Sequence, residues 1–229
     1  MHIIETTQLK KVYEGPVPVY AVNDVNLTFD AGEFTAIVGP SGSGKTTLLN
    51  LIGGLDRPTS GDITVAGTIM NELSENELIR FRLHNIGFVF QSYNLIPVLT
   101  ARENAEFTML LQKHPKKERL ERVDQLLKEV GLADQAYKTP GALSGGQQQR
   151  VAVVRALAPK PRFVLADEPT ANLDGHSAEN LLDIMLKLNR EENVTFIFST
   201  HDNRVIERAR RVITLEDGKI VSDEVRNKQ

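Results

Sequence analysis

Hydrophobic residues along the chain gather in short apolar runs that alternate with amphipathic stretches. Four runs are apolar without alternation and rich in β-branched or aromatic residues, which is typical of strands buried on both faces of a sheet. These runs are residues 34–38, 86–91, 163–167 and 194–200. Because such runs alternate with helical patterns, the sequence predicts an α/β fold with a largely parallel sheet.

Two other parts of the chain depart from this alternation. Residues 212–223, VITLEDGKIVSD, form two alternating runs around Asp217 and Gly218, which predicts an antiparallel hairpin. From residue 100 to residue 158 the pattern is mostly helical. Thr100 and Glu103 fit a capping box, and Pro115 suits the first turn of a helix that ends near Gly131. A helical block between core strands predicts an inserted subdomain.

Composition narrows the class of protein. The 229 residues are 41% hydrophobic and 25% charged, with a net charge of -3, which is ordinary for a globular protein and offers no basic surface for nucleic acid. No cysteine is present, so disulfides and thiolate metal sites are excluded. The first residues, MHIIETTQLKK, lack a secretory hydrophobic region, and no apolar run is long enough to span a bilayer. We therefore expect any membrane role to come through a partner.

The first segment with candidate chemistry is GPSGSGKT, residues 39–46, between a predicted strand and a helical pattern. Its spacing fits the phosphate-loop pattern G-x-x-x-x-G-K-[ST]. Glycines let backbone N–H groups turn inward around an anion, and the next helix directs its positive end to the same point. Lys45 would place its charge on the β- and γ-phosphates, and the Thr46 hydroxyl would bind Mg²⁺. The motif alone does not separate kinases, GTPases, motors and pumps.

Two carboxylates end the predicted strand FVLAD. Asp167 is its last residue and Glu168 follows directly, and ligands of open α/β sheets bind at the carboxyl ends of strands. Asp167 would hold Mg²⁺, and Glu168 could act as general base toward an attacking water. Taken alone, the pair is more typical of a surface turn, but next to a phosphate loop it favours catalysis.

A second glycine-rich helix start lies in ALSGGQQQRVAVVRAL, residues 142–157. Ser144 and Gln147 fit a capping box, and Gly145 and Gly146 leave backbone N–H groups uncovered. One fold cannot easily bring two such helix ends to one phosphate. A symmetric dimer, in which each chain completes the site of the other, is the simplest resolution.

With LSGGQ between a phosphate loop and VLADEPT, the chain resembles the ATP-binding subunits of ATP-binding-cassette (ABC) transporters over essentially its whole length. The resemblance implies a P-loop NTPase (RecA-like) core with a mainly parallel sheet, an antiparallel β-subdomain and an inserted helical subdomain. It implies one nucleotide-binding domain over 1–229, with the core and β-subdomain in 1–91 and 160–229 and the helical subdomain in 92–159. ATP and Mg²⁺ are the implied ligands.

The resemblance also assigns catalytic roles. Glu168 matches the catalytic glutamate, Lys45 the phosphate-loop lysine, and His201, in FSTHD, the switch histidine that contacts the γ-phosphate. Gln91 matches the glutamine that contacts Mg²⁺ and water and senses the membrane partner. The implied Mg²⁺ ligands are Thr46, Gln91 and Asp167.

Nucleotide-binding roles follow from the same resemblance. Tyr13, in KVYEG, matches the aromatic residue that stacks on adenine, although by itself it is equally typical of a core or surface tyrosine. Asp174, in ANLD, matches the loop that links the two sites of a dimer. Residues 143–147 match the signature that binds the γ-phosphate of the opposite subunit. The implied binding residues are Tyr13, Gly39, Pro40, Ser41, Gly42, Ser43, Gly44, Lys45, Thr46, Thr47, Ser144, Gly145, Gly146, Gln147 and Asp174.

The segment IGFVFQSYNLIPVLTARENAEF and the signature helix resemble most closely the lipoprotein-releasing, macrolide-export and cell-division ATP-binding subunits. This resemblance implies an integral membrane permease as partner, a homodimer when ATP is bound, and a periplasmic adaptor reached through the permease. It implies a peripheral location on the cytoplasmic face of the inner membrane. Charged substitutions at Leu95 and Leu99 would uncouple transport if residues 94–100 dock the permease, and would impair folding if they only pack.

Three functions stay open on the sequence alone. The first is an ATPase that drives export or lipoprotein release. The second is an ATP-driven clamp that controls an extracytoplasmic enzyme through a membrane partner and moves no substrate. The third, a cassette ATPase of DNA repair or translation, is disfavoured because those proteins usually carry two cassettes or long insertions. A simple kinase is disfavoured because it has no use for a signature helix.

Overall fold

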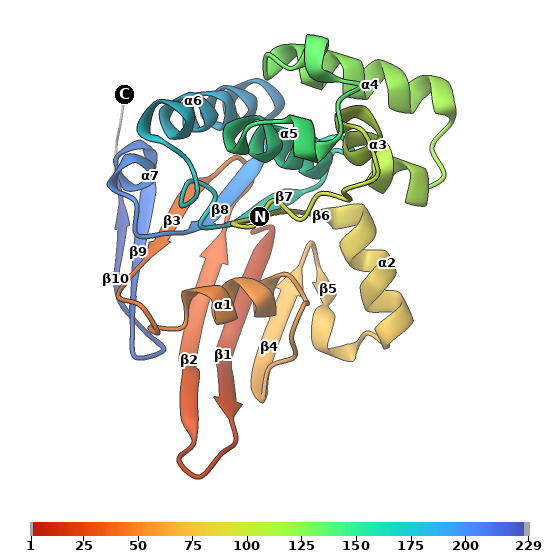
Figure 1. Cartoon of the computed structure of the whole chain (residues 1–229). Helices are drawn as coiled ribbons and strands as arrows, with labels where there is room; N and C mark the ends of the chain where they lie inside the picture. Colours follow the sequence, from red (N-terminus) through yellow and green to blue (C-terminus); the bar gives the residue numbers. More distant parts are fainter. Residues whose placement is uncertain (1, 227–229) are drawn as a thin grey trace.

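The computed structural model describes residues 2–226, which form two β-sheets and the helices around them (Figure 1). The six-stranded sheet contains β3 (Phe34–Val38), β6 (Ile86–Phe90), β7 (Phe163–Asp167), β8 (Thr195–Ser199), β9 (Arg211–Glu216) and β10 (Lys219–Val225). Its strand order is β10-β9-β3-β8-β7-β6. All neighbours in it are parallel except β10, which pairs antiparallel with β9. The predicted α/β class is therefore confirmed.

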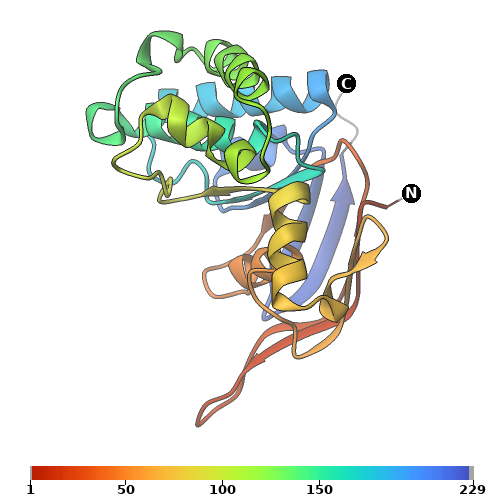
Figure 2. The same cartoon turned by 90° about the vertical axis from the view of Figure 1, so that its right-hand side faces the viewer.

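The four-stranded sheet is antiparallel and has the order β2-β1-β4-β5. Its strands are β1 (Ile4–Tyr13), β2 (Val19–Phe29), β4 (Ser60–Val65) and β5 (Thr68–Ile69). The β1–β2 hairpin extends well beyond the rest of the molecule (Figures 1 and 2). This sheet was not predicted from local patterns, although the resemblance implied an antiparallel β-subdomain.

Seven α-helices and three short 3₁₀ turns complete the described residues. The helices are α1 (Lys45–Ile52), α2 (Glu75–Asn85), α3 (Ala101–Leu111), α4 (Lys116–Glu129), α5 (Gly145–Leu157), α6 (Gly175–Glu192) and α7 (Asn203–Arg208). The 3₁₀ turns are Met70–Glu72, Ala133–Gln135 and Pro140–Ala142. Helices α3, α4, α5 and α6 lie on the side of the six-stranded sheet away from the hairpin (Figures 1 and 2).

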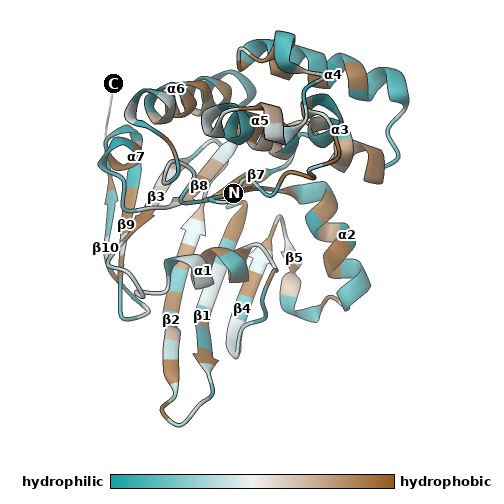
Figure 3. Ribbon diagram, viewed as in Figure 1, coloured by the Kyte–Doolittle hydropathy of each residue, from teal (hydrophilic) through white to brown (hydrophobic). Residues whose placement is uncertain are grey.

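Strands β3, β6, β7 and β8 are largely buried on both faces of the sheet, which explains why they lack alternation. On β8, Phe196 and Phe198 belong to the hydrophobic cluster shared with α5 and α6. Ile197, between them, belongs to the second cluster, shared with α1 and the four-stranded sheet. Figure 3 shows this distribution, with apolar residues along the central strands and mostly hydrophilic residues on the outer helix α4. Helix α1 thus lies between the two sheets.

The predicted boundaries agree with the structure within about two residues, the usual uncertainty of helix and strand ends. Gln91, Val194 and Thr200 fall just outside β6 and β8. In the predicted hairpin, Asp217 and Gly218 have φ values of 46° and 75°, which is the left-handed pair that a two-residue turn requires. The Thr100–Glu103 capping box is present at the start of α3. Pro115 precedes its helix as N-cap, one position before the first turn.

Candidate functional site

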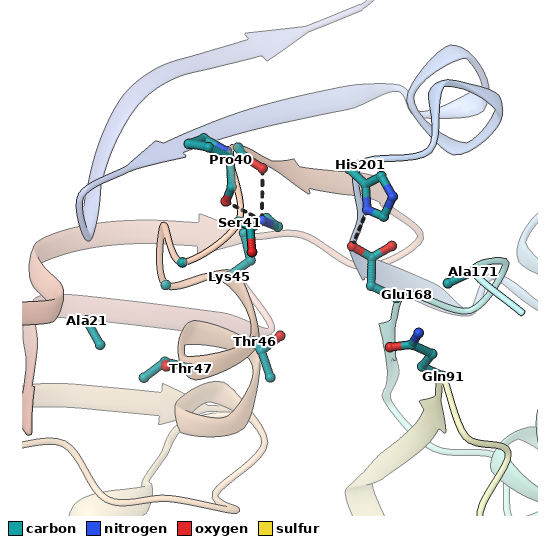
Figure 4. Close-up of a pocket in the computed structure, with 13 residues that line it drawn as sticks. Ala21, Pro40, Ser41, Lys45, Thr46, Thr47, Gln91, Glu168, Ala171 and His201 are labelled. Atoms are coloured by element: carbon teal, nitrogen blue, oxygen red, sulfur yellow. Dashed lines mark hydrogen bonds and ion pairs between the residues drawn. The ribbon is translucent and has the colours of Figure 1, made fainter.

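Four loops meet at the carboxyl edge of the parallel strands. The phosphate loop follows β3, and Gln91, Glu168 and His201 follow β6, β7 and β8. Because these strands are parallel neighbours, their carboxyl ends lie at one edge. Figure 4 shows these side chains around a common cavity. The volume of the cavity is about 600 Å³. Its lining residues are Ala21, Gly39, Pro40, Ser41, Gly42, Gly44, Lys45, Thr46, Thr47, Gln91, Glu168, Ala171 and His201.

The phosphate loop has a backbone that only glycine adopts easily. The φ values of Gly39, Gly42 and Gly44 are 148°, 80° and 102°. A Cβ atom added to Gly44 would lie 1.9 Å from the carbonyl oxygen of Ala21, and one added to Gly39 would lie 2.0 Å from that of Leu215. The loop is therefore pressed against neighbouring backbone on one side and open to the cavity on the other.

Helix α1 begins directly after this loop without a side-chain cap. Gly44 is its N-cap and offers no side chain to the first backbone N–H groups. Such groups are free donors, and the helix dipole adds positive potential at the same end. A phosphate group would satisfy both. The loop therefore fits the triphosphate that its sequence predicts.

Lys45 spans the phosphate loop. Its Nζ atom donates to the carbonyl oxygens of Gly39 and Pro40, each at 2.8 Å. These two bonds hold the ammonium group at the edge of the cavity. Phosphate oxygens bound there would replace the neutral carbonyl acceptors with charged ones, which form stronger hydrogen bonds with an ammonium group. Ser43, also predicted to bind nucleotide, is buried beneath the loop and does not line the cavity.

The two main predicted Mg²⁺ ligands are in contact. The Thr46 hydroxyl donates to Oδ1 of Asp167 at 3.1 Å, although the residues are 121 positions apart. Residues 2–226 contain no group of three or more His, Cys, Asp or Glu residues that could hold a metal ion by themselves. One carboxylate with a hydroxyl suits Mg²⁺, which usually takes one or two carboxylates, waters and substrate phosphates. The residues present thus fit Mg²⁺ bound together with a nucleotide.

Glu168 and His201 form a hydrogen-bonded pair at the rim of the cavity (Figure 4). His201 Nδ1 lies 2.8 Å from Oε1 of Glu168, and the Thr200 hydroxyl donates to Oε2 at 3.2 Å. The Glu168 side chain is 17% exposed and that of His201 is 76% exposed. Both carboxylate oxygens of Glu168 are therefore oriented. Thr200 was not among the predicted site residues, although it directly precedes His201 at the end of a predicted strand.

Gln91 lines the cavity, and the loop after it is fastened to two other loops. The Asn172 amide donates to the carbonyl oxygen of Gln91 at 3.0 Å. Arg155, on α5, donates to the carbonyl oxygens of Tyr93, at 2.8 Å, and Asn94. The loop after β6 is thus held by the signature helix and by the segment before α6.

The signature residues lie outside this cavity. Ser144 is exposed and caps α5, accepting from Gln147 N at 3.3 Å, and Gln147 Oε1 accepts from Ser144 N at 2.9 Å. The predicted capping box is therefore confirmed. None of Ser144, Gly145, Gly146 and Gln147 lines the phosphate cavity of the same chain. Asp174 is also outside the cavity, at the N-terminus of α6, where it accepts from Ser177 N at 3.0 Å.

Tyr13 lies at the end of β1 and does not line the cavity. The residue is 45% exposed, and its hydroxyl donates to Oδ2 of Asp56 at 3.0 Å. Its contact with adenine stays a prediction. Ala21 and Ala171 do line the cavity and were not predicted, because an alanine carries no chemical signal in a sequence.

The segment 94–100 divides between packing and exposure. Leu95 packs against the hydrophobic cluster under the helices, which favours the packing alternative for this residue. An apolar groove of about 620 Å³ lies beside it, and Asn94 is the part of the segment that lines it. The groove is formed mainly by Leu55, Ile79, Phe88, Phe90, Leu111 and Pro159.

Comparison with known sequences agrees with these motifs. A family model described as ABC transporter matches residues 22–171. The lipoprotein-releasing system ATP-binding protein LolD of Anaeromyxobacter dehalogenans is 47% identical over 222 residues, which cover 96% of this chain and 93% of that protein. The macrolide export ATP-binding/permease protein MacB of Aggregatibacter actinomycetemcomitans is 45% identical over 224 residues. That match covers 97% of this chain and 35% of the longer MacB protein.

Solved structures share the whole fold. The ATP-binding cassette MJ0796, in a dimeric post-hydrolysis state bound to ADP and Pi, has a TM-score of 0.90 at 42% identity. The match covers 99% of this chain and 100% of that chain. CbiO1 from Clostridium perfringens, part of the ABC transporter complex cbiONQ, has a TM-score of 0.88 at 29% identity, covering 98% of this chain and 88% of that chain. The chain therefore belongs to the ABC transporter family, as an ATP-binding subunit that hydrolyses ATP.

Proposed function

We propose that this chain binds MgATP at a site shared by two copies, hydrolyses it and thereby changes the conformation of an integral membrane permease. One observation supports the shared site above all. The residues suited to phosphate, Mg²⁺ and water surround one cavity, while the signature end of α5, with Ser144 exposed, lies outside it. A second copy arranged head to tail would bring its own signature to the open side of the cavity.

Within this site, the chain itself would supply most of the charge stabilisation. Lys45 and the free N–H groups of α1 would bind the phosphate oxygens. Thr46 and Asp167, joined at 3.1 Å, would hold Mg²⁺, with Gln91 at the same cavity. Bound Mg²⁺ neutralises charge on the phosphate oxygens. Such catalysis depends on positioning and electrostatics rather than on covalent chemistry.

Glu168 would act on the attacking water. Its carboxylate is oriented by His201 and Thr200, so one oxygen can accept the water proton while the water oxygen bonds to the γ-phosphorus. The bond from that phosphorus to the bridging oxygen breaks, which leaves ADP and inorganic phosphate. His201, with most of its side chain exposed, would contact the γ-phosphate from the rim.

The membrane partner would dock in the apolar groove beside Gln91. The groove is lined by Asn94 and Arg155, and Arg155 also holds the loop that follows Gln91. A segment of the permease in the groove would therefore touch the structure that connects Gln91 with the signature helix. We propose that the helical subdomain, residues 92–159, transmits this contact to the signature.

The subgroup of transporter is a finer proposal. The relatives named above are described as a lipoprotein-releasing ATP-binding protein and a macrolide export protein, so we propose lipoprotein release or export as the coupled process. Among residues 2–226, every helix is too short or too polar to cross a membrane. We therefore propose peripheral attachment through the permease, at the cytoplasmic face of the inner membrane, with a periplasmic adaptor beyond the permease.

The ATPase rate of the Glu168→Gln variant tests the catalytic proposal. We expect the rate to fall about 10²–10³-fold, because an oriented acceptor for the water proton is lost. MgATP affinity, measured by titration calorimetry, should stay close to that of the wild type. Glu216→Gln, an exposed position on β9, is the matched control and should hydrolyse ATP normally.

One result would contradict the role of Glu168, and another would contradict the role of the phosphate loop. Wild-type hydrolysis by Glu168→Gln would show that Glu168 is not the base. Equal hydrolysis by wild type and by a Lys45→Ala variant would show that the phosphate loop is not the ATPase site.

A further inference from the structure

A cluster of three side chains outside the cavity connects the first strand with the end of α1. Lys11 and Tyr13 are two positions apart on β1, so their side chains point to one face of the strand. Asp56 lies in the turn after α1. Its Oδ1 accepts from Nζ of Lys11 at 2.7 Å, and its Oδ2 accepts from the Tyr13 hydroxyl at 3.0 Å. The Lys11 ammonium lies 5.0 Å from the centre of the Tyr13 ring.

The cluster is more deeply embedded than a typical surface ion pair. The Lys11 side chain is 14% exposed and that of Asp56 is 31% exposed. Lys11 also donates to the carbonyl oxygen of Arg57 at 2.8 Å, and Asp56 accepts from Arg57 N at 2.7 Å. Burial alone would raise the pKa of Asp56, but hydrogen bonds from Lys11 and Tyr13 lower it on balance. The carboxylate therefore stays charged at neutral pH.

Asp56 is also fixed to the helix that presents the phosphate loop. Its backbone N–H donates to the carbonyl oxygen of Asn50 at 3.3 Å, and Leu55 N donates to the same oxygen at 2.8 Å. Asn50 belongs to α1, which begins at Lys45. The position of the Tyr13 hydroxyl is therefore set relative to the helix whose N-terminus faces the cavity.

The strand pair that carries Tyr13 runs close to that cavity. Tyr13 pairs with Val19 across the hairpin, so both side chains lie on the same face. Ala21, two positions after Val19 on β2, lines the cavity at the point where the β1–β2 register shifts. Tyr13 is 45% exposed and Val19 is 58% exposed, so this face carries uncovered apolar surface next to the phosphate loop.

We propose that Asp56, together with Lys11, is a positioning residue for nucleotide binding. It holds the Tyr13 ring at a fixed place and orientation, so that the base stacks on the ring while the phosphates bind the loop at the other end of the cavity. This inference rests on the proposed MgATP site. Because the ring is fixed before the nucleotide binds, binding does not cost the entropy of ordering this side chain. The Lys11 ammonium group lies over one face of the ring and leaves the other face for the base.

Calorimetry with two ligands separates this role from a structural one. MgATP reports on the base and the phosphates together, whereas Mg-tripolyphosphate reports on the phosphate loop alone. Tyr13→Phe keeps the ring and removes its hydroxyl, and Asp56→Asn removes the charge. We expect each variant to bind MgATP about three- to tenfold more weakly, because a hydrogen bond to a charged partner is lost. Tripolyphosphate affinity should stay within about twofold of wild type, a split that a merely structural role would not produce.

The double variant Tyr13→Phe/Asp56→Asn should bind MgATP about as tightly as either single variant, because both substitutions remove the same contact. Tyr20→Phe, on the exposed part of β2, and Asp62→Asn, on β4, are matched controls that should bind both ligands like the wild type. Unchanged melting temperatures show that the variants fold.

Three possible results would each contradict a different claim about Asp56, Tyr13 or the nucleotide site. If Tyr13→Ala weakens MgATP binding while Tyr13→Phe and Asp56→Asn do not, the contact of the Tyr13 ring with the base is supported and the positioning role of Asp56 is refuted. If Tyr13→Ala binds MgATP like the wild type, Tyr13 does not contact the base and the inference fails entirely. If the wild-type chain binds neither ligand, the proposed nucleotide site itself is wrong.

Discussion

Glu168 has a backbone conformation, φ 46°, that residues with a side chain seldom adopt. Its backbone N–H donates to the carbonyl oxygen of Ser199, at the end of the neighbouring strand β8, at 2.9 Å. Together with the bonds from Thr200 and His201, this contact fixes both ends of the residue. A left-handed residue at the end of a buried strand stores strain that its neighbours must hold, which is typical of functional sites.

Backbone conformation also makes a prediction for the phosphate loop. Gly44→Ala should lower the free energy of unfolding by about 1–3 kcal/mol and abolish measurable MgATP binding, because φ is 102° and Cβ would overlap the carbonyl oxygen of Ala21. Gly141→Ala is the matched control, since nothing lies within 4 Å of its added Cβ. Thermal unfolding and calorimetry measure the two effects. Tight MgATP binding by Gly44→Ala would show that the loop is not held against Ala21.

The sequence identified most of the single residues in the cavity, because their signal is local. The spacing of GPSGSGKT named the phosphate loop directly. The contact between Tyr13 and Asp56 was not predictable in this way, since the two residues are 43 positions apart and neither belongs to a spacing pattern. Their contact depends on the path of the chain after α1, which only the assembled fold determines.

At the scale of elements, caps and short loops position the functional groups. Asp202 caps α7 by accepting from Arg204 N at 2.9 Å, and it also accepts from the Thr170 hydroxyl at 2.7 Å. Arg204 forms a salt bridge with the same carboxylate. The loop that carries His201 is thereby joined to the segment after Glu168, so one carboxylate links the two segments that carry the Glu168–His201 pair.

The pH dependence of stability tests this link. Burial alone would raise the pKa of Asp202, but hydrogen bonds from Arg204 and Thr170 lower it to about 2 from its ordinary value of 3.8. Because the folded pKa is the lower one, the stabilisation is complete above pH 3.8 and disappears as pH falls toward 2.

Asp202→Asn should therefore lower the melting temperature at pH 7 by roughly 2–4 °C, the shift expected for about 1 kcal/mol in a chain of this size. The difference from wild type should narrow below pH 4. Thermal unfolding between pH 7 and pH 3 measures it. A difference that is constant over this range would show that the charge of Asp202 does not contribute. Asp217→Asn, in the exposed β9–β10 turn, is the control.

Strands and helix caps could be predicted where a short sequence pattern, such as an apolar run, is sufficient to specify them. The runs at 34–38 and 163–167 became β3 and β7 with the same bounds. The four-stranded sheet was less accessible, because β1 and β2 are long strands with several register shifts and mixed exposure. For Leu95, pattern alone left packing and docking open, and only the fold shows that it packs against the hydrophobic cluster.

The molecule as a whole has two surfaces that a single chain leaves unused. One is the open cavity, which lacks a signature of its own. The other is the apolar groove beside β6, at the edge of the six-stranded sheet opposite β10. We propose that a second copy covers the cavity and that the permease occupies the groove.

Co-purification from membranes tests the groove. Ile79 lines it and is 51% exposed, so Ile79→Glu places a charge in an apolar interface without disturbing the core. We expect the variant to lose its integral membrane partner and to keep wild-type ATPase activity as an isolated chain. Val221→Glu, 54% exposed on the opposite edge strand β10, should retain the partner. Equal recovery of the partner with Ile79→Glu and wild type would rule out this groove.

The mass of the Glu168→Gln chain in saturating MgATP tests most directly whether two copies share the nucleotide. Light scattering should give twice the mass of one chain with MgATP and the mass of a single chain without it. Adding Ser144→Arg should keep the chain monomeric while Mg-tripolyphosphate binding is retained. A single-chain mass in saturating MgATP, or a dimer that tolerates Ser144→Arg, would contradict the account.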